Sequence, residues 1–484
     1  MTTIKLDPGA ALLLDALHGA GHAAYAVGGC VRDSLLGLAP HDWDLCTSAR
    51  PEQVMALFGE EKCIPTGLQH GTVTVKQGGR LYETTTFRTE GAYSDGRHPD
   101  AVCFVPDVRE DLARRDFTIN AMAYSAEEGL IDPFGGRGDL AAHLVRAVGE
   151  PERRFEEDAL RILRLYRFAA RFGFAIDPAT GAAARALGPH LDCVSAERIQ
   201  EELLKLLAAP RPGSYLEPAV LAVVLPELEP EKQPERFAEL CRTIDRIEPT
   251  AENVPARLAA LLCPLGEAGA RKALRKLKCS NALTDEVTAL EREAGGGAGS
   301  FLLGHEFELR HPADALCLER HSHPAGRCPN SNSLFPPQAA VVAVAGHSIA
   351  RPIACGNRVP PQRTVLGETP GTPNTTLTVQ AKRLLGRYEL PTIQRLTALC
   401  SARHPEQAVA FAALRAEAER LTAENACCRV SQLAVNGRDL MAAGVRPGPG
   451  LRQVLNVLLE AVITGQTPNE KDALLAAAAQ FSAS

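Results

Sequence analysis

Two aspartates that follow a double glycine form the sharpest chemical signal in the sequence. Gly28 and Gly29 end a short apolar segment, and Asp42 and Asp44 follow with one residue between them. If these aspartates lie on a strand, their side chains share one face while Trp43 points to the other. Paired carboxylates repel each other, whereas Mg²⁺ commonly binds between carboxylates and substrate phosphates. The pattern therefore predicts a magnesium site at Asp42 and Asp44.

The same segment favours phosphoryl transfer to a hydroxyl group. Two bound metal ions can activate an attacking hydroxyl and stabilise a leaving pyrophosphate. Gly28 and Gly29 let the backbone approach triphosphate oxygens closely, and Arg32 offers those oxygens a charged fork. Alone, a double glycine indicates a turn and an Asp-x-Asp pattern a solvated loop, but their combination in this order is much rarer. Glu83, in a separate expected strand, is either a third catalytic carboxylate or a surface glutamate.

A stripe of charged residues on an expected helix offers a second chemistry, the recognition of a base. Within 154–174, Asp158, Arg161, Arg164 and Arg167 recur every third residue and lie on one side of a single helix. Most other positions are apolar. An ordinary solvent-exposed face with an Asp–Arg ion pair explains the same pattern.

Short helices and strands over roughly the first 150 residues must position these side chains. Apolar spacing predicts helices within 10–25 and over 51–58. A hairpin turn is expected at Gly78-Gly79. The expected strands are 25–27, 72–76 and 81–88.

Beyond about residue 150 the apolar spacing is helical, apart from one anomalous stretch. A helix opening at 195–198 is interpreted as structural. The stretch 301–378 is dense in Pro, Cys, His, Asn and Thr and has no sustained period. A disordered insertion and a departure from a genuine coding frame both explain it. Its histidines and cysteines match no compact zinc-ligand spacing.

Composition and charge exclude several classes of protein. Of the 484 residues, 45% are apolar and 23% charged, which is ordinary for a soluble globular protein. The net charge of −6 gives no global nucleic-acid signature, so any basic surface must be local. No apolar run approaches the roughly 20 residues needed to cross a bilayer, and the start lacks the order of a secretory signal. The 14 cysteines form no regular framework, so we expect reduced thiols and a cytoplasmic location.

Five motifs follow one another in a fixed order within residues 20–207. They are Gly28-Gly29-x-Val31-Arg32-Asp33, Asp42-x-Asp44, Arg114–Ala121, Asp132–Gly136 and Glu157-Asp158-x-x-Arg161. This order resembles that of the bacterial class II CCA-adding tRNA nucleotidyltransferases and bacterial poly(A) polymerases, which belong to the polymerase β superfamily. The resemblance is weak beyond residue 210 and absent in 301–378.

The resemblance implies an α+β fold with five parts. They are a mixed α/β nucleotidyltransferase head with a small β-sheet (1–150), a helical neck (151–210), a helical body (211–300), a helical tail that binds tRNA (379–484) and, between body and tail, the irregular insertion (301–378) that composition alone indicates. The head carries the catalytic site and the neck selects the nucleotide. No prediction is made for the oligomeric state.

The resemblance also assigns roles in nucleotide binding. Asp158 and Arg161 act as a protein template: the carboxylate accepts from the exocyclic amine of cytosine or adenine, and the guanidinium donates to the adjacent ring nitrogen or carbonyl. Uracil and guanine leave these groups unpaired. Arg115 and Asp116 lie near the nucleotide, with Asp116 on the ribose hydroxyls. Arg164 and Arg167 neutralise the triphosphate.

The function expected from the resemblance is template-independent addition of CCA to the 3′ end of tRNA. The substrates are CTP and ATP, the metal is Mg²⁺ and the product is pyrophosphate. The segment 87–99 resembles a flexible loop of this family that is associated with the switch to adenosine, which favours complete CCA addition. The alternatives are a poly(A) polymerase and a catalytically inactive RNA-binding relative.

Overall fold

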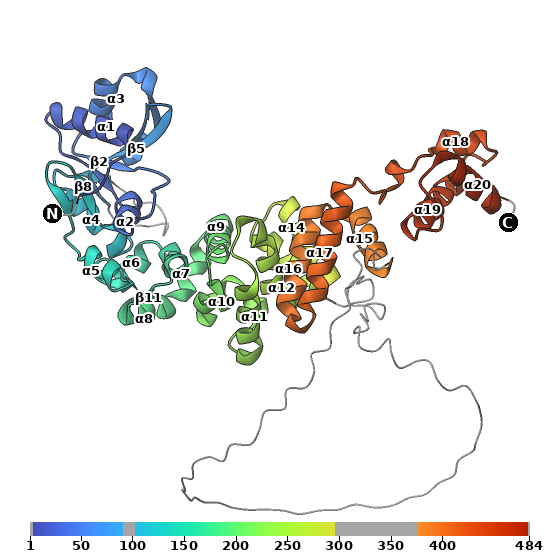
Figure 1. Ribbon diagram of the computed structural model, residues 1–484. Helices are drawn as coiled ribbons and strands as arrows, with labels where there is room; N and C mark the ends of the chain where they lie inside the picture. Colours follow the sequence, from blue (N-terminus) through green and yellow to red (C-terminus); the bar gives the residue numbers. More distant parts are fainter. Residues whose placement is uncertain (1–2, 91–101, 296–374, 483–484) are drawn as a thin grey trace, which may run out of the picture. The chain divides into compact units, whose positions relative to one another are not determined.

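A small mixed sheet precedes a long series of helices in the computed structural model, which describes residues 3–90, 102–295 and 375–482 (Figure 1). This arrangement confirms the expected α+β class. The irregular segment expected at 301–378 lies outside the described residues, except that its last four residues begin helix α15 (Thr375–Arg387). Among the described helices, none combines the length and the apolar character that crossing a membrane requires.

The sheet has seven strands in the described residues, in the order β3-β4-β5-β2-β1-β8-β9. All neighbours are antiparallel except β2 and β5, which run parallel with Leu45 opposite Thr84. The hairpin expected at Gly78-Gly79 is confirmed, because both glycines have positive φ and join β4 to β5. The strands are β1 (Ala24–Val27), β2 (Leu45–Thr47), β3 (Cys63–Gly67), β4 (Thr72–Gln77), β5 (Arg80–Thr86), β8 (Ala123–Ser125) and β9 (Gly129–Ile131).

Strand β1 is buried on both faces, and this explains its uniformly apolar sequence. Ala24 and Ala26 belong to a core shared with α1 (Pro8–Gly19) and α3 (Pro51–Phe58). Tyr25 and Val27 belong to a second core with α4 (Val108–Ala113). The head helices expected within 10–25 and over 51–58 are therefore present, and they cover one face of the sheet.

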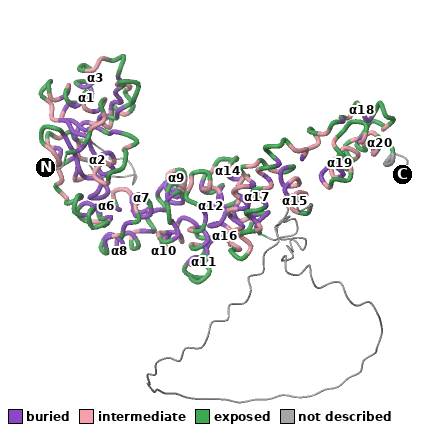
Figure 2. The backbone as a smooth tube through the Cα atoms, in the orientation of Figure 1, coloured by how far each residue is buried: buried purple, intermediate pink, exposed green. Residues whose placement is uncertain are grey.

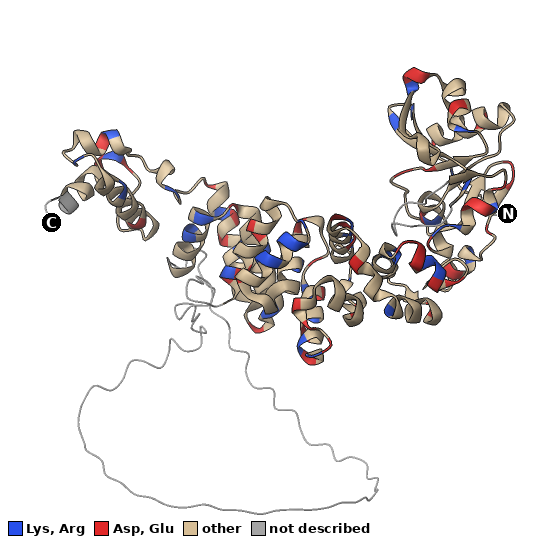
Figure 3. Ribbon diagram, turned by 180° about the vertical axis from the view of Figure 1, so that it is seen from behind, with Lys and Arg blue, Asp and Glu red and all other residues tan. Residues whose placement is uncertain are grey.

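The helices from α6 to α17 belong to one apolar cluster, which also includes residues of the head, and buried residues recur along these helices in Figure 2. Leu290 of α14 and Leu396 of α16 belong to the same cluster although about a hundred residues separate them. Helices α18, α19 and α20 have a smaller core of their own. Acidic and basic residues are interspersed along the helices (Figure 3).

The remaining elements complete the described chain. The short strands are β6 (Arg88–Glu90), β7 (Val102–Phe104), β10 (Leu144–Val145) and β11 (Ala175–Ile176). The helices are α2 (Gly29–Leu35), α5 (Gly136–Ala141), α6 (Pro151–Glu157), α7 (Leu160–Phe172), α8 (Pro178–Ala186), α9 (Ala196–Leu207), α10 (Pro218–Val224), α11 (Pro234–Arg246), α12 (Val254–Leu262), α13 (Gly266–Lys276), α14 (Asn281–Ala294), α16 (Leu390–Arg403), α17 (Ala408–Ala423), α18 (Gly437–Ala442), α19 (Pro449–Ile463) and α20 (Lys471–Ser482).

The single helix expected over 154–174 is wrong, because the chain breaks at Asp158 between α6 and α7. Asp158 is extended, with φ −149° and ψ 102°. Its carboxylate oxygen Oδ1 accepts a hydrogen bond from the Leu160 N–H at 3.1 Å. Aspartate side chains that bond to nearby backbone groups compete with helix continuation, and here the competition ends α6. Asp158 therefore lies before the helix that carries Arg161, Arg164 and Arg167.

Candidate active site

The two aspartates lie immediately before β2 rather than within it. The expected strand began at Asp42, but β2 begins at Leu45. The alternation nevertheless extends upstream, since Asp42 and Asp44 are exposed and Trp43 is buried. The Val27 N–H donates to the Asp44 carbonyl at 3.0 Å and continues the β1–β2 ladder. Both carboxylates therefore emerge on the solvent side of the sheet edge.

Glu83 lies in the strand beside Asp44 and is exposed. The parallel register pairs Leu45 with Thr84, so Asp44 and Glu83 precede this pair by one residue on each strand. Asp44 reaches solvent, but the protein atoms packed around its carboxyl group partly desolvate it and raise its pKa to about 6; the charges of Glu83 and Asp42 add to the rise. The structure thus brings the three expected carboxylates to one region.

The negative charge at this edge fits a hard divalent cation. Among the described residues, no three Asp, Glu, His or Cys side chains lie together in an arrangement that could bind a metal ion by themselves. The fit rests on Asp42 and Asp44, because Mg²⁺ usually takes one or two carboxylates and fills its other positions with water and phosphate oxygens. Desolvation is the largest cause of the raised pKa of Asp44, and the negative charges of Glu83 and Asp42 add to it while Arg115 opposes it.

The glycine turn beside the carboxylates requires glycine. Gly28 has φ +77° and ψ −122°, and a Cβ atom there would lie 2.9 Å from Nη1 of Arg115. The Arg115 charge also opposes the rise in the pKa of Asp44. Gly29 opens α2 directly after this turn. Arg115 therefore lies close to both the glycine turn and the carboxylate edge, and its contact with a nucleotide stays a prediction.

Arg32 is enclosed by other side chains. Its Nε donates to Asp33 Oδ1 at 2.8 Å and its Nη1 to Asn120 Oδ1 at 2.5 Å. The guanidinium carbon lies 4.8 Å from the centroid of the Phe172 ring, and the side chain is buried. Arg32 thus joins α2 to the turn at Asn120 and to α7, and its contact with a triphosphate stays a prediction.

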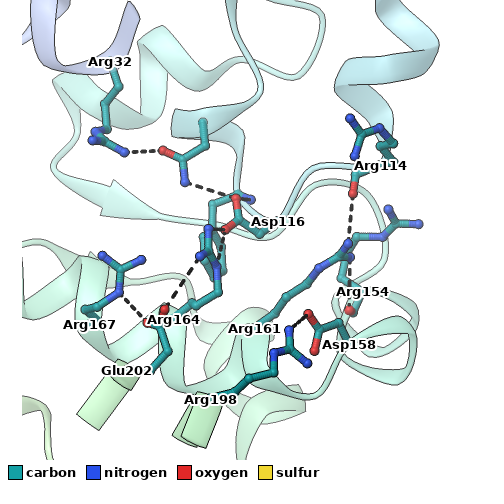
Figure 4. A network of polar contacts seen from close by, with 12 residues as sticks. Arg32, Arg114, Asp116, Arg154, Asp158, Arg161, Arg164, Arg167, Arg198 and Glu202 are labelled. Atoms are coloured by element: carbon teal, nitrogen blue, oxygen red, sulfur yellow. Dashed lines mark hydrogen bonds and ion pairs between the residues drawn. The ribbon is translucent and has the colours of Figure 1, made fainter. Parts of the chain in front are cut away.

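Asp116 is held in a buried ion pair with Arg164. Its Oδ2 accepts from Nε and Nη2 of Arg164 at 2.9 and 2.6 Å, and its Oδ1 accepts from Asn120 Nδ2 at 3.0 Å (Figure 4). Burial alone would raise the pKa of Asp116, but Arg164 and Asn120 lower it to about 2. Asn120 and Arg164 thus both hold the carboxylate of Asp116, which belongs to the head.

Asp158 and Arg161 do not pair with each other; each bonds to a different residue. Asp158 Oδ2 accepts from Arg198 Nη2 at 2.8 Å (Figure 4). Arg161 Nη1 donates to Glu157 Oε2 at 2.8 Å, and its Nη2 donates to the Arg114 carbonyl at 3.1 Å. The two expected base-reading groups are thus held separately, at the junction of α6 and α7.

Helix α9 supplies two charged residues that the sequence analysis did not assign to the site. Arg198, interpreted as part of a structural helix start, contacts Asp158. Glu202 is buried and accepts from Arg167 Nε at 2.5 Å. Arg198 and Glu202 lie four residues apart, so one face of α9 carries both. That spacing was a usable signal, but it does not reveal which helix this face meets.

A pocket of about 340 Å³ opens beside Glu157 and is large enough for a nucleotide base. The head and α6 both contribute to its wall. The lining residues include Thr89, Ala113, Arg114, Phe134, Arg153 and Glu157.

Three family models match successive parts of this chain. The Poly A polymerase head domain matches residues 24–146, and the probable RNA and SrmB-binding site of polymerase A matches residues 173–231. A putative tRNA nucleotidyltransferase domain 2 matches residues 385–478. Together with the sheet and its carboxylates, these matches define a nucleotidyltransferase with a poly(A) polymerase-type head.

Similar proteins narrow this class to one family. A CCA-adding enzyme of Levilactobacillus brevis is 33% identical over 465 residues, which cover 96% of each chain. One of Leuconostoc citreum is 45% identical over 257 residues, but these cover only 53% of this chain and 63% of that protein. The crystal structure of the Bacillus stearothermophilus CCA-adding enzyme in complex with CTP is 29% identical, with a TM-score of 0.68 and coverage of 99% and 98%. This chain belongs to the CCA-adding enzyme family.

Proposed function

We propose that this protein adds CCA to the 3′ end of tRNA from CTP and ATP without a nucleic-acid template. The observation that carries the proposal is that one chain of this family retains both the carboxylate pair Asp42 and Asp44 and the base-reading pair Asp158 and Arg161. The 3′ hydroxyl of the tRNA attacks the α-phosphate in line, and pyrophosphate leaves. Because tRNA is the substrate, we propose that this nucleotide addition takes place in the cytoplasm.

Asp42 and Asp44 are the residues that hold magnesium. Two Mg²⁺ ions bound there would activate the attacking hydroxyl and stabilise charge on the leaving pyrophosphate. Glu83 adds negative charge beside Asp44 and so favours cation binding at this edge. Gly28 and Gly29 allow the triphosphate to approach the backbone without a side chain in the way.

Asp158 and Arg161 choose the base. Asp158 accepts from the exocyclic amine of cytosine or adenine, and Arg161 donates to the neighbouring ring acceptor. Uracil and guanine present a carbonyl to Asp158 and a ring N–H to Arg161, so both contacts fail. The same pair of side chains therefore accepts C and A and rejects U and G.

The other charged residues orient and neutralise the nucleotide. Asp116 serves the ribose hydroxyls, and Arg115 lies beside the glycine turn. Arg32, Arg164 and Arg167 offset the triphosphate charge. Each of these three arginines has an internal carboxylate partner in the structure. Nucleotide binding therefore shares or exchanges these ion pairs rather than filling an array of unpaired cations.

The direct test is extension of a tRNA that lacks its 3′ CCA, resolved to single nucleotides. CTP alone should give two additions, and CTP with ATP should give three. Long adenosine tails with ATP alone would identify a poly(A) polymerase instead. Two additions with both nucleotides would contradict complete CCA addition, which rests on the segment 87–99; residues 91–99 of it lie outside the described residues.

A further inference from the structure

A second pocket of about 340 Å³ lies against a different face of α7 from the candidate active site. Its wall is formed by α7, β11, α8, the start of α10 and the 3₁₀ helix η5 (Pro212–Tyr215) (Figure 1). Tyr166 of α7 lines this pocket, which we call the Tyr166 pocket. Successive helix residues are rotated by about 100°, so Tyr166 lies about 200° around α7 from Arg164. A ligand here would therefore contact a different side of α7 from the side that meets Asp116.

The hydroxyl of Tyr166 is buried without a hydrogen-bond partner. Tyr166 is only 4% exposed, and no described residue bonds to its hydroxyl. A buried polar group that loses water without gaining another bond costs free energy, so such groups are rare. Burial raises the pKa of this hydroxyl, and the negative charge of Glu217 adds to the rise. The hydroxyl therefore keeps its proton and can donate it in a hydrogen bond to a ligand.

Two opposite charges lie close to this hydroxyl. Arg185 of α8 and Glu217, the residue before α10, both line the pocket, and both affect the pKa of Tyr166. Their charged atoms are 3.7 Å apart, which is too far for a hydrogen bond. The Arg185 side chain is 51% exposed and the Glu217 side chain 23%, so a ligand can reach both. The pocket thus offers a carboxylate acceptor, a guanidinium donor and a hydroxyl.

The rest of the wall suits a flat ring. It includes Ile176, Pro178, Tyr215, Leu216 and Pro218. A nucleobase packs its faces against such surfaces while its edge bonds to a few polar groups. Asp177, the other carboxylate of the wall, already pairs with Arg146 and accepts from the Thr180 hydroxyl. Glu217 is therefore the carboxylate that is placed to accept from a ligand.

We propose that the Tyr166 pocket binds a nucleotide whose base carries an exocyclic amine. Glu217 accepts from the amine, and Tyr166 and Arg185 donate to acceptors of the base and the phosphate. Adenine carries such an amine, whereas uracil lacks one and would leave Glu217 unpaired. This nucleotide is a bound ligand and not the one that is added to tRNA, so the proposal goes beyond the proposed function. A free nucleotide and an unpaired nucleotide of an RNA offer the same chemistry.

The test is isothermal titration of the full chain with AMP and with UMP, without Mg²⁺. The titrations use Asp158→Ala, which removes the base contact expected at the active site. A charged hydrogen bond changes affinity by about 10–100-fold and a neutral one by about 3–10-fold. We therefore expect AMP to bind at least about tenfold more tightly than UMP. Adding Glu217→Ala should weaken AMP binding by about 10–100-fold, and adding Tyr166→Phe by about 3–10-fold.

Folding and the matched control are tested on the same preparations. Tyr166→Phe removes a hydroxyl that has no described partner, so its unfolding midpoint without ligand should be no lower than that of its parent. Glu217 makes no side-chain cap bond at the start of α10, so Glu217→Ala should fold as well. Tyr388→Phe removes a hydroxyl that donates to Glu293 elsewhere in the chain, and it should leave AMP affinity unchanged.

A titration with oligo(A) distinguishes the two sources of the nucleotide. Tighter binding of oligo(A) than of AMP, with the same sensitivity to Tyr166→Phe, would identify an RNA nucleotide, and the reverse order a free nucleotide. No saturable binding of AMP or oligo(A), equal affinity for AMP and UMP, or unchanged affinity in both pocket variants would overturn the proposal. Failure of the wild type to add CCA would contradict the proposed function and not this one, because these titrations do not depend on nucleotide addition.

Discussion

The carboxyl group of Asp44 titrates closer to neutrality than an ordinary aspartate. Burial, with the charge of Glu83 and Asp42, raises its pKa to about 6 from the ordinary value of 3.8. The folded protein therefore holds this proton more tightly than the unfolded chain does. The resulting stability is present below pH 3.8 and is lost as the pH rises through about 6. The site thus has its full negative charge, which metal binding needs, only above that pH.

Magnesium affinity should depend steeply on pH because a proton and the metal compete for Asp44. Below pH 6 the apparent affinity should fall by up to about tenfold per pH unit, and above pH 7 it should level off. Isothermal titration with Mg²⁺ and CTP between pH 5 and 8 measures this. Asp44→Asn should bind weakly at every pH and lose the dependence. A constant affinity across this range would contradict the role of Asp44.

Removal of Asp42 should abolish nucleotide incorporation without unfolding the protein. Asp42 is exposed, so Asp42→Ala leaves no cavity and no buried unpaired group. Loss of a metal ligand should nevertheless lower turnover at least about 100-fold. Extension of tRNA lacking CCA measures the activity, and the unfolding midpoint reports the fold. Asp15→Ala, at an exposed aspartate of α1, is the matched control and should retain full activity. Turnover near the wild-type rate in Asp42→Ala would remove the metal assignment.

At the scale of elements, local sequence patterns predicted several helices and strands, but they did not predict the contacts between distant segments. Strand β1, the β4–β5 hairpin and α3 follow from apolar spacing and turn glycines, and the structure confirms them. The break between α6 and α7 did not follow from spacing, since one hydrogen bond from Asp158 to a backbone N–H decides it.

The contacts of α9 were beyond sequence reasoning for a different reason. The charges of Arg198 and Glu202 are evident in the sequence, but their partners lie 35–40 residues earlier, Arg167 on α7 and Asp158 in the break before it. Sequence spacing identifies which side chains share a face of one helix and does not identify the helix opposite. The Asp42–Asp44 pair and the glycine turns of the head, whose geometry is local, could therefore be predicted, whereas the ion-pair partners in the neck could not.

Arg257 donates hydrogen bonds to backbone carbonyl groups at the end of α9 and should contribute to the free energy of unfolding. The side chain is fully buried and donates to the carbonyl oxygens of Leu207, Ala209, Pro210 and Ile247. Arg257→Met removes these donors and leaves buried carbonyls unpaired, which should lower the free energy of unfolding by about 3–5 kcal/mol. Denaturant unfolding measures the loss.

An exposed arginine provides the control for this prediction. Arg185 of α8 is about half exposed and lies 3.7 Å from Glu217. Arg185→Met should change the free energy of unfolding by about 1 kcal/mol or less, because exposed ion pairs contribute little. Equal effects of the two substitutions would contradict the structural role of Arg257.

At the scale of the molecule, the helices on either side of 296–374 share one core. Tyr388 of the α15–α16 junction donates to Glu293 of α14 at 2.9 Å. Leu290 of α14 and Leu384 of α15 are both buried in the same apolar cluster. The helices before and after the intervening segment are thus joined by direct contacts among the described residues.

Replacement of residues 301–372 by a Gly/Ser linker of about 20 residues should therefore preserve the fold. We expect an unfolding midpoint close to that of the full chain and retention of nucleotide addition. Calorimetry and the tRNA extension assay measure these two properties on the same preparation. A large drop in the midpoint would show that the segment contributes to the core, and loss of addition with an unchanged midpoint would show that it contributes to tRNA binding.

The most direct test of the whole account is the sequence of the nucleotides that the protein adds when all four are offered together. The protein is incubated with tRNA lacking CCA, Mg²⁺ and equal concentrations of CTP, ATP, UTP and GTP, and the 3′ ends are sequenced. The account predicts C, C and A in that order, followed by a stop, as complete CCA addition requires. The absence of U and G follows from Asp158 and Arg161, which accept only cytosine and adenine. Adenosine tails, or ends that contain U and G in proportion to supply, would contradict it.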